Sequence, residues 1–544
     1  MKLTIDHISV EVQEGLSVLE AAASLGIDIP TMCFKPGFTN HPSCMVCLVK
    51  EVGRDNLVPS CSMPVAEGMD ILTGSEEVII ARREALELLL SDHIGDCEAP
   101  CRLTCPAFMD IPLMNRLIAR GDFVKALRIV REEIAIPFVL GTICPAPCEK
   151  ACKRRPIDQA VSICLLKRSA AEFGEVDRDL PKSTGKKIAI IGTGPAGLST
   201  AFYLLQSGHS VVLFDLHEKA GGTLQYDIPE DHLPREILQT EIDTIRNMGA
   251  EFRLGTLVTH DLFHQTILPQ FDAVILATGS RTINPPEPFG IGTEAQVDKH
   301  TLSTTIPGVF ACGSIIREQR MAVQSAAQGK LAAQQVERYF RTMGAHVLQA
   351  GISDHLQPCI MHDHPVSQGD PHTKHRSVSA FGPLFEPEFK EYLREAIPGH
   401  RMEPAGSKLQ GFTREEAIRE ALRCMHCDCR KPVSCKLKQY AEQYDASRKR
   451  FAVPDRNLLT RSVQHDLVVF ETEKCIRCGL CVEITSLYGE SIGLTFAGRG
   501  FDVRISVPFN ETIKAALTIT ARECVESCPT GALAFKEQEE RNSL

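Results

Sequence analysis

The stretch from Lys186 to Gly222 constrains the fold more than any other part of this sequence: KKIAIIGTGPAGLSTAFYLLQSGHSVVLFDLHEKAGG. An apolar run of strand length meets the pattern Gly-x-Gly-x-x-Gly, and a helical pattern then leads into a second strand that ends on an acid. Such glycines let the backbone approach a pyrophosphate, a helix N-terminus favours its negative charge, and the acid can accept hydrogen bonds from a ribose. A glycine-rich turn in an ordinary α/β core would not need all of these parts in this order. We therefore expect dinucleotide binding at Gly192, Gly194, Pro195, Ala196, Gly197 and Asp215.

Length, charge and cysteine content limit the remaining possibilities. A chain of 544 residues is expected to hold about three to five domains. Its net charge of -10 argues against a nucleic-acid partner. We expect no membrane span, because no long apolar run occurs, and no signal peptide, because the first residues alternate like a strand. The 22 cysteines form tight groups beside a nucleotide-binding pattern. This favours metal clusters in a reducing cytosol over the disulfides of a secreted chain.

Residues 1–78 are predicted to form strands, a helix over 17–25, and loops that carry four cysteines. Four thiolates at Cys33, Cys44, Cys47 and Cys61 suit a [2Fe–2S] cluster, and a zinc ion would use the same ligands. The segments SCMVCLV and LVPSCSMPVAEGM resemble the N-terminal ferredoxin domain of the large iron–sulfur subunit of respiratory complex I and of NADH-linked hydrogenases and formate dehydrogenases. The resemblance implies a β-grasp fold that holds [2Fe–2S].

Residues 79–175 are predicted to be helical, with an amphipathic helix over 115–133. They contain two groups of cysteines with three residues between neighbours: Cys97, Cys101 and Cys105, then Cys144, Cys148 and Cys152. With Cys164 the thiols are one ligand short of the two sets of four that two [4Fe–4S] clusters require.

This segment resembles the small subunit of glutamate synthase and the N-terminal half of dihydropyrimidine dehydrogenase. The resemblance implies interleaved ligands, so that Cys105, Cys144 and Cys148 hold one cluster while Cys97, Cys101 and Cys152 hold the other. Cys164 and His93 are our candidates for the fourth ligands. Cys164 lies close to the family's second cluster segment, and His93 continues the three-residue spacing upstream of Cys97. A surface or capping role is the alternative for His93.

The same resemblance continues through residues 176–342 in GTGPAGLSTA, GGTLQYDIPEDHLP, DAVILATGS and IPGVFACGS. It implies a Rossmann-like FAD domain, with further contacts from Gly222, Thr223, His232, Val258, Thr278, Gly279, Gly313 and Ser314. Two of these depart from the family pattern. Ser314 stands where an acid is usual, and His232 stands where an arginine is usual.

A second nucleotide-binding domain is missing from the sequence. In the glutamate synthase small subunit an NADPH-binding unit of about 100 residues is inserted between the ATG turn and the late glycine turn. Here only residues 280–307 separate Gly279 from Gly308, and they contain no strand followed by Gly-x-Gly-x-x-Gly and a helix. We therefore expect no pyridine nucleotide beside this flavin, and electrons must reach it through clusters or a partner subunit.

Three segments follow the flavin domain. Residues 343–410 are rich in His, Pro and Gly, and we predict a linker rather than a metal site because no ligand spacing recurs. Residues 411–445 hold a third candidate [4Fe–4S] set, for which zinc is the alternative: Cys424, Cys427, Cys429 and Cys435. Residues 446–544 resemble a ferredoxin that has kept one of two clusters, since Thr485 replaces a ligand of the other. The ferredoxin rule then gives Cys475, Cys478, Cys481 and Cys528 as ligands. Cys312, Cys359 and Cys524 are left over as buried small residues.

The predicted fold is therefore a multidomain α/β and α+β chain with a β-grasp domain, a helical cluster domain, an FAD domain and a C-terminal ferredoxin-like domain. We expect an oxidoreductase subunit that transfers electrons through FAD, one [2Fe–2S] and three to four [4Fe–4S] clusters. The partners implied by resemblance are an NAD-binding flavoprotein subunit like those of complex I, and a formate dehydrogenase, a hydrogenase or a ferredoxin. The composition is compatible with electron bifurcation at the flavin. The alternatives are a self-sufficient NAD(P)H dehydrogenase or glutamate synthase subunit, and a scaffold whose cysteines bind zinc.

Overall fold

The computed structural model describes residues 1–93, 97–175, 181–279, 297–349, 386–431, 433–451 and 458–536. The described residues form two compact units. The first unit draws on residues 1–99, 369–395 and 426–544, and the second on residues 100–368 and 396–425. No helix among the described residues is both long enough and apolar enough to cross a bilayer. Residues 350–375, which hold most of the His-rich run and Cys359, lie outside the described residues.

The first unit begins with a mixed sheet that packs against one helix. Its strands lie in the order β2-β1-β5-β3-β4, with β1 parallel to β5. The helix begins at Ser17, whose side chain accepts a hydrogen bond from Glu20 N while the Glu20 side chain caps Ser17 in return. This arrangement agrees with the predicted β-grasp fold and helix. The bounds are β1 (Lys2–Ile5), β2 (Ile8–Glu11), α1 (Val18–Ser24), β3 (Leu48–Glu51), β4 (Leu57–Pro59) and β5 (Asp70–Leu72).

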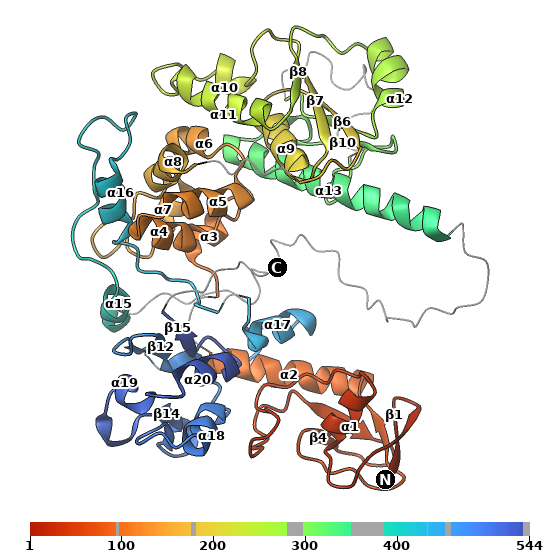
Figure 1. Cartoon of the computed structure of the whole chain (residues 1–544), viewed down its shortest axis with the longest axis vertical. Coiled ribbons are helices and arrows are strands. Elements are labelled where there is room, and N and C mark those ends of the chain that lie inside the picture. The colour runs from red at the N-terminus through yellow and green to blue at the C-terminus, as the bar shows by residue number, and fades with distance from the viewer. Residues whose placement is uncertain are drawn as a thin grey trace. The chain divides into compact units, whose positions relative to one another are not determined.

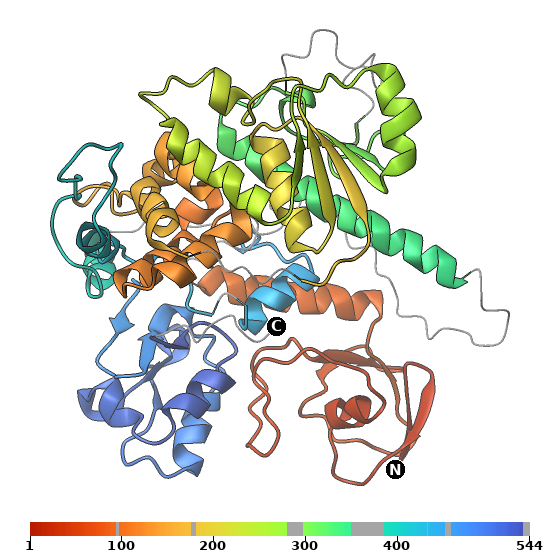
Figure 2. The same ribbon diagram turned by 45° about the horizontal axis from the view of Figure 1, so that its top comes forward.

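A long helix, α2 (Glu76–Asp92), leaves this sheet and packs against α17 (Lys436–Gln443) in the same unit. Figures 1 and 2 show the two helices side by side. Arg82 Nη1 donates to Tyr444 Oη at 3.0 Å, and Arg83 Nε donates to the Tyr444 carbonyl at 2.8 Å. Leu86 and Leu437 are fully buried in the apolar cluster that the helices share. The N-terminal part of the chain is thus held against a segment near its other end.

The C-terminal part of the first unit is built on a short antiparallel sheet in the order β11-β12-β15. Val468, Phe470, Ile484 and Leu533 form its buried core. A separate hairpin, β13-β14, stands beside it. The bounds are α15 (Glu386–Leu393), β11 (Arg461–Ser462), β12 (Val468–Glu471), η5 (Thr472–Lys474), α18 (Leu480–Leu487), β13 (Thr495–Ala497), η6 (Gly500–Asp502), β14 (Arg504–Ser506), η7 (Pro508–Asn510), α19 (Ile513–Ala516), α20 (Ala521–Ser527) and β15 (Leu533–Phe535).

The second unit starts with a group of short helices. The predicted single helix over 115–133 is wrong, because the chain forms two helices there. Gly121 has a φ of 77°, which only glycine adopts readily, and Asp122 caps the next helix by accepting from Lys125 N at 3.0 Å. The bounds are α3 (Pro100–Thr104), α4 (Ile111–Ala119), α5 (Phe123–Glu133), α6 (Pro137–Ile143), α7 (Pro147–Lys150), α8 (Ile163–Phe173) and α16 (Arg414–Ala421).

The rest of the second unit is a parallel sheet in the order β10-β9-β6-β7-β8. Figure 1 shows α9 and α13 packed together against this sheet. The predicted strand–loop–helix–strand is present, and α13 continues past residue 342, the predicted domain end. The bounds are β6 (Lys187–Ile191), α9 (Pro195–Gln206), β7 (Ser210–Phe214), α10 (Thr223–Tyr226), α11 (Arg235–Asn247), β8 (Glu251–Arg253), η1 (Leu262–Ile267), α12 (Leu268–Gln270), β9 (Ala273–Leu276), β10 (Val309–Ala311), η4 (Gly313–Ile315) and α13 (Ala322–Gln349).

Candidate functional site

The loop between β6 and α9 has the close packing that its glycines allow. A Cβ atom at position 197 would lie 2.0 Å from the Gly192 carbonyl oxygen, and one at position 192 would lie 2.4 Å from the Ala277 oxygen. A Cβ at Gly194, the residue before α9, would meet no protein atom within 4 Å. No side chain caps this helix, so its first N–H groups face the open side of the loop. The loop therefore fits the pyrophosphate of a dinucleotide.

Asp215 lies at the end of β7 and is 8% exposed. Thr193 donates to its Oδ2 from N at 2.8 Å and from Oγ1 at 2.6 Å. His217 N donates to Oδ1 at 2.9 Å, and His217 Nδ1 lies 3.0 Å from the same atom. A carboxylate has about four acceptor positions, and these contacts occupy them. Asp215 thus fixes the shape of the glycine loop through Thr193, which the sequence did not single out. The contact of Asp215 with a ribose stays a prediction.

Two later turns meet the same loop. A Cβ at Gly222 would lie 2.9 Å from Gly194 Cα, and a Cβ at Gly313 would lie 2.9 Å from Ala196 Cβ. Thr223 follows in α10, Thr278 and Gly279 follow β9, and Ser314 follows in η4, where its Oγ accepts from Gln319 N at 3.3 Å. The structure therefore brings most of the expected flavin contacts together.

Two expected flavin contacts are not placed at this loop. His232 is exposed and lies in a turn, where its backbone N–H donates to the Pro229 carbonyl at 3.0 Å. Val258 is buried in an apolar cluster with Phe263 and Val274. Their contact with FAD stays a prediction.

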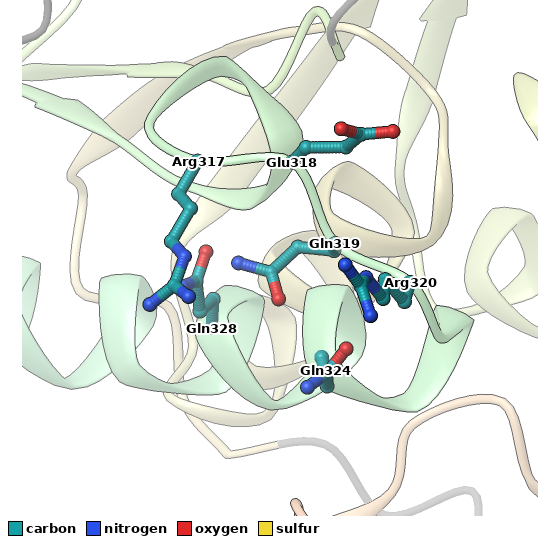
Figure 3. A pocket seen from close by; sticks show the side chains of 6 residues that line it. All are labelled: Arg317, Glu318, Gln319, Arg320, Gln324 and Gln328. Atoms are coloured by element: carbon teal, nitrogen blue, oxygen red, sulfur yellow. The ribbon is translucent and has the colours of Figure 1, made fainter.

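A cavity of about 610 Å³ opens beside the late turn (Figure 3). Its side chains come from the loop before α13 and from the first turns of α13: Arg317, Glu318, Gln319, Arg320, Gln324 and Gln328. Gln328 Oε1 accepts from Gly313 N at 2.8 Å, which ties the cavity to the glycine turn. Figure 3 shows Arg317 and Gln319 reaching from the loop toward α13. Two guanidinium groups suit an anionic ligand, and the sequence reasoning did not identify them.

The structure gathers the first predicted cysteine set, and all four residues are buried: Cys33, Cys44, Cys47 and Cys61. Cys33 Sγ lies 3.5 Å from Cys44 Sγ. Hydrogen bonds from the thiols of Cys44 and Cys61 lower the pKa of Cys33, while the same contact raises the pKa of Cys44. A thiolate is therefore stabilised within the set, which is the form that binds iron.

A second set gathers around a buried lysine: Cys105, Cys144, Cys148 and Cys164. Lys167 Nζ lies 4.0 Å from Cys164 Sγ, and Cys164 N donates to Glu149 Oε1 at 2.9 Å. Burial lowers the pKa of Lys167, but the neighbouring cysteines, Cys164 foremost, outweigh it and raise that pKa. The structure thus places the candidate Cys164 with the three cysteines that the resemblance assigned to one cluster.

A third set gathers at the C-terminal sheet: Cys475, Cys478, Cys481 and Cys528. Burial, followed by Cys528, raises the pKa of Cys475 to about 12. Thr485, which replaces a ligand, is buried and has a structural role, because its Oγ1 accepts from Leu494 N at 3.1 Å. Cys524 is fully buried, as expected of a small packing residue.

Cys97 has neighbours that the sequence did not predict. Cys97 lies beside Cys429 and Cys435, and the Cys429 N–H donates to the Cys97 carbonyl at 3.3 Å. Cys424 belongs to the second unit and Cys427 to the first. The grouping of Cys97 with Cys101 and Cys152 stays a prediction, as does the set from Cys424 to Cys435.

His93 is the C-cap residue of α2, which agrees with the capping role considered for it, and it is 9% exposed, so it is not a surface residue. Burial, followed by the charge of Lys474, lowers its pKa to about 3, so its ring is neutral. Within the described residues, no three Cys, His, Asp or Glu side chains are spaced as ligands of a single ion. Four thiolates can bind an iron–sulfur cluster or a zinc ion, and zinc stays the alternative for the cysteine sets.

Comparison with known families agrees with these three kinds of site. Residues 1–76 match a 2Fe-2S iron-sulfur cluster binding domain, and residues 91–178 match dihydropyrimidine dehydrogenase domain II, with its 4Fe-4S cluster. Residues 186–301 match the pyridine nucleotide-disulphide oxidoreductases. The chain carries the domains of an iron–sulfur flavoprotein.

Curated relatives of this iron–sulfur flavoprotein include NADPH-Fe(3+) oxidoreductase subunit beta of Geobacter sulfurreducens, 36% identical over 34% of this chain and 29% of the relative. The NADP(+)-dependent formate dehydrogenase subunit beta of Moorella thermoacetica is 36% identical over 33% of this chain and 29% of its own. The glutamate synthase [NADPH] small chain of Bacillus subtilis is 40% identical over 32% of this chain and 37% of its own length. The iron–sulfur flavoprotein thus spans well under half the length of these relatives.

Proposed function

We propose that this iron–sulfur flavoprotein is an electron-transferring subunit of a larger NAD(P)H-linked oxidoreductase. It would relay electrons between a partner that oxidises a nicotinamide and a catalytic redox subunit or a ferredoxin. When bound, FAD exchanges one or two electrons and an iron–sulfur cluster exchanges one. The chain's own part is to bind these groups, to bury them and to hold them close together.

One apolar cluster in the first unit carries the proposal. It contains Cys33 and Cys44 of the first set, Cys435 from the segment before α17, and Cys478 of the C-terminal set at its margin. Burial raises the pKa of Cys478, and Cys33 is among the groups that raise it further. Cysteines from three candidate cluster sites therefore share one buried neighbourhood. Neighbouring clusters are the arrangement that an electron relay needs.

The connection between β9 and β10 supports the second part of the proposal. Both strands belong to the same parallel sheet, with Val309 paired to Val274. Only residues 280–307 separate Gly279 from Gly308, whereas a nucleotide-binding domain needs about 100 residues. The flavin would therefore receive its electrons from clusters or from a partner rather than from a nicotinamide bound in this chain.

Anaerobic stopped-flow spectroscopy of the isolated chain tests the proposal. Dithionite is expected to reduce both the flavin and the clusters, while NADH and NADPH leave the flavin oxidised over the same seconds. Addition of a co-purified nicotinamide-oxidising subunit is expected to restore reduction. Rapid bleaching of FAD by NADH or NADPH in the chain alone would instead establish a self-sufficient dehydrogenase.

A further inference from the structure

The cavity beside the late glycine turn lies outside the loop that fits the pyrophosphate. Its volume of about 610 Å³ is typical of small-molecule sites. Its lining consists of Arg317, Glu318, Gln319, Arg320, Gln324 and Gln328. Among the described residues, none of this lining comes from the glycine loop of residues 192–197 or from Asp215. The cavity is therefore a separate feature of the second unit.

Two guanidinium groups of the lining are open to solvent. Arg317 and Arg320 are exposed, and neither side chain forms an ion pair or a hydrogen bond with another described residue. Glu318 is the acid in the lining, and Figure 3 shows its carboxylate turned away from both arginines. Both positive charges are thus available to a ligand, and a guanidinium group is suited to carboxylates and phosphates.

Two glutamines of the lining add further donors. Gln328 Oε1 accepts a hydrogen bond from Gly313 N at 2.8 Å, and Gln324 Oε1 accepts one from Met321 N at 3.2 Å. These contacts orient the amides, and each Nε2 remains a donor that has no acceptor within the described part of the chain. Since α13 begins at Ala322, its first N–H groups and its positive dipole end lie at the same place. The cavity therefore suits an anion that is rich in acceptors.

The positions of the two guanidinium groups indicate how the charge of such a ligand is distributed. Figure 3 shows Arg317 on one side of the lining and Arg320 on the other, with Gln319 between them. A guanidinium group pairs with a carboxylate through two parallel hydrogen bonds. A ligand with a carboxylate at each end would satisfy both arginines, whereas a phosphate ester carries its charge at one end.

We propose that this cavity binds a small dicarboxylate, with one carboxylate on Arg317 and the other on Arg320. The amides of Gln319 and Gln324 would donate to the polar groups between them. This inference goes beyond the proposed function, which gives the chain electrons to relay but no small organic ligand of its own. Because Gly313 is also an expected flavin contact, the ligand would lie close to the flavin.

Isothermal titration calorimetry of the full chain, purified without oxygen and with its cofactors, tests the proposal. Succinate and glutarate are the probes, butyrate is the monocarboxylate for comparison, and inorganic phosphate tests the other anion. The dicarboxylates are expected to bind about ten-fold or more tightly than butyrate or phosphate, because two charged pairs form rather than one. Arg317→Gln and Arg320→Gln should each weaken succinate binding by a similar factor. Arg338→Gln is the matched control, because Arg338 is an exposed residue of α13 outside the lining.

The flavin content and the melting temperature of each variant without ligand should match those of the native chain. Loss of FAD from Arg317→Gln or Arg320→Gln would overturn the proposal, since the arginines would then belong to the flavin site. Succinate that does not bind at millimolar concentration, phosphate that binds more tightly than succinate, or an equal loss of affinity in Arg338→Gln would also overturn it. If an arginine variant does not fold, the native chain still decides, because equal affinity for succinate and butyrate would refute a dicarboxylate site. The stopped-flow experiment tests the proposed function separately.

Discussion

The buried lysine beside the second cysteine set predicts a shift in redox potential. Lys167 is 4% exposed, and its Nζ lies 4.0 Å from Cys164 Sγ. Lys167→Met replaces the positive charge with an apolar chain of similar length. Two unit charges at this distance interact by about 4 kcal/mol at an effective dielectric constant of about 20. Because the added electron is spread over a cluster beyond the sulfur, we take about half of this value.

About 2 kcal/mol corresponds to roughly 90 mV for a one-electron couple. The potential of the cluster that we expect Cys105, Cys144, Cys148 and Cys164 to bind is expected to fall by this amount in Lys167→Met. An EPR-monitored redox titration of the full chain measures it. Lys150→Met is the matched control, because Lys150 is exposed and lies two residues after Cys148, so solvent should screen its charge. An unchanged or raised potential in Lys167→Met would refute the assignment of Lys167 to this cluster.

Three further predictions concern the flavin loop, the cysteine set and the pH dependence of stability. Gly194→Ala is expected to fold normally but to purify with little FAD, because its Cβ occupies the open side of the loop. Gly197→Ala should also lower the melting temperature, because its Cβ clashes with the Gly192 carbonyl at a cost of about 1–3 kcal/mol. Thermal melts of the apoprotein and flavin absorbance of the purified protein separate the two variants. Cys164→Ser is expected to lose about four iron atoms per chain, which iron analysis measures. An unchanged iron content in this variant would show that Cys164 only fills space. Burial raises the pKa of Glu241 to about 7. Above about pH 4.5 the folded state therefore keeps a proton that the unfolded state releases. This proton binding favours the folded state, and its contribution to stability is lost as the pH rises through 7. The unfolding free energy of the native chain relative to Glu241→Gln should therefore increase as the pH falls from 7 to 5, by at most about 3 kcal/mol in urea titrations. A difference that is constant with pH would contradict the raised pKa.

The sequence predicted best what depends on local pattern. The strand, glycine loop and helix from Lys187 to Gln206 follow the apolar periodicity, because each glycine is required by a contact within the same βα unit. The predicted helix over 115–133 failed because amphipathic periodicity continues across the break, while Gly121 and Asp122 have the local chemistry of a helix end and a cap.

Other features depend on contacts between distant segments and could not be predicted. The proximity of Cys97 to Cys429 and Cys435 is one of them, because these residues come from distant parts of the chain. The grouping of Cys97 with Cys101 and Cys152, which the resemblance implied, stays a prediction. Thr193 and Lys167 were also missed. Thr193 occupies a variable position of the glycine motif and Lys167 belongs to no motif, so only the fold shows that the first positions the glycine loop and that the second lies beside a cysteine set.

The pairing of α2 with α17 has a consequence for the order in which the protein matures. During synthesis α2 leaves the ribosome long before Tyr444, which Arg82 and Arg83 bind, and before Arg450, whose Nη1 donates to Glu87 at 2.9 Å. Until then α2 has only its contacts with the N-terminal sheet, such as the hydrogen bonds from Arg82 to the Leu48 carbonyl, and its contacts with α17 are missing. The native packing of α2 is therefore completed only after the segment around α17 has been made, so a chain that stops before residue 436 is expected to leave part of this helix exposed.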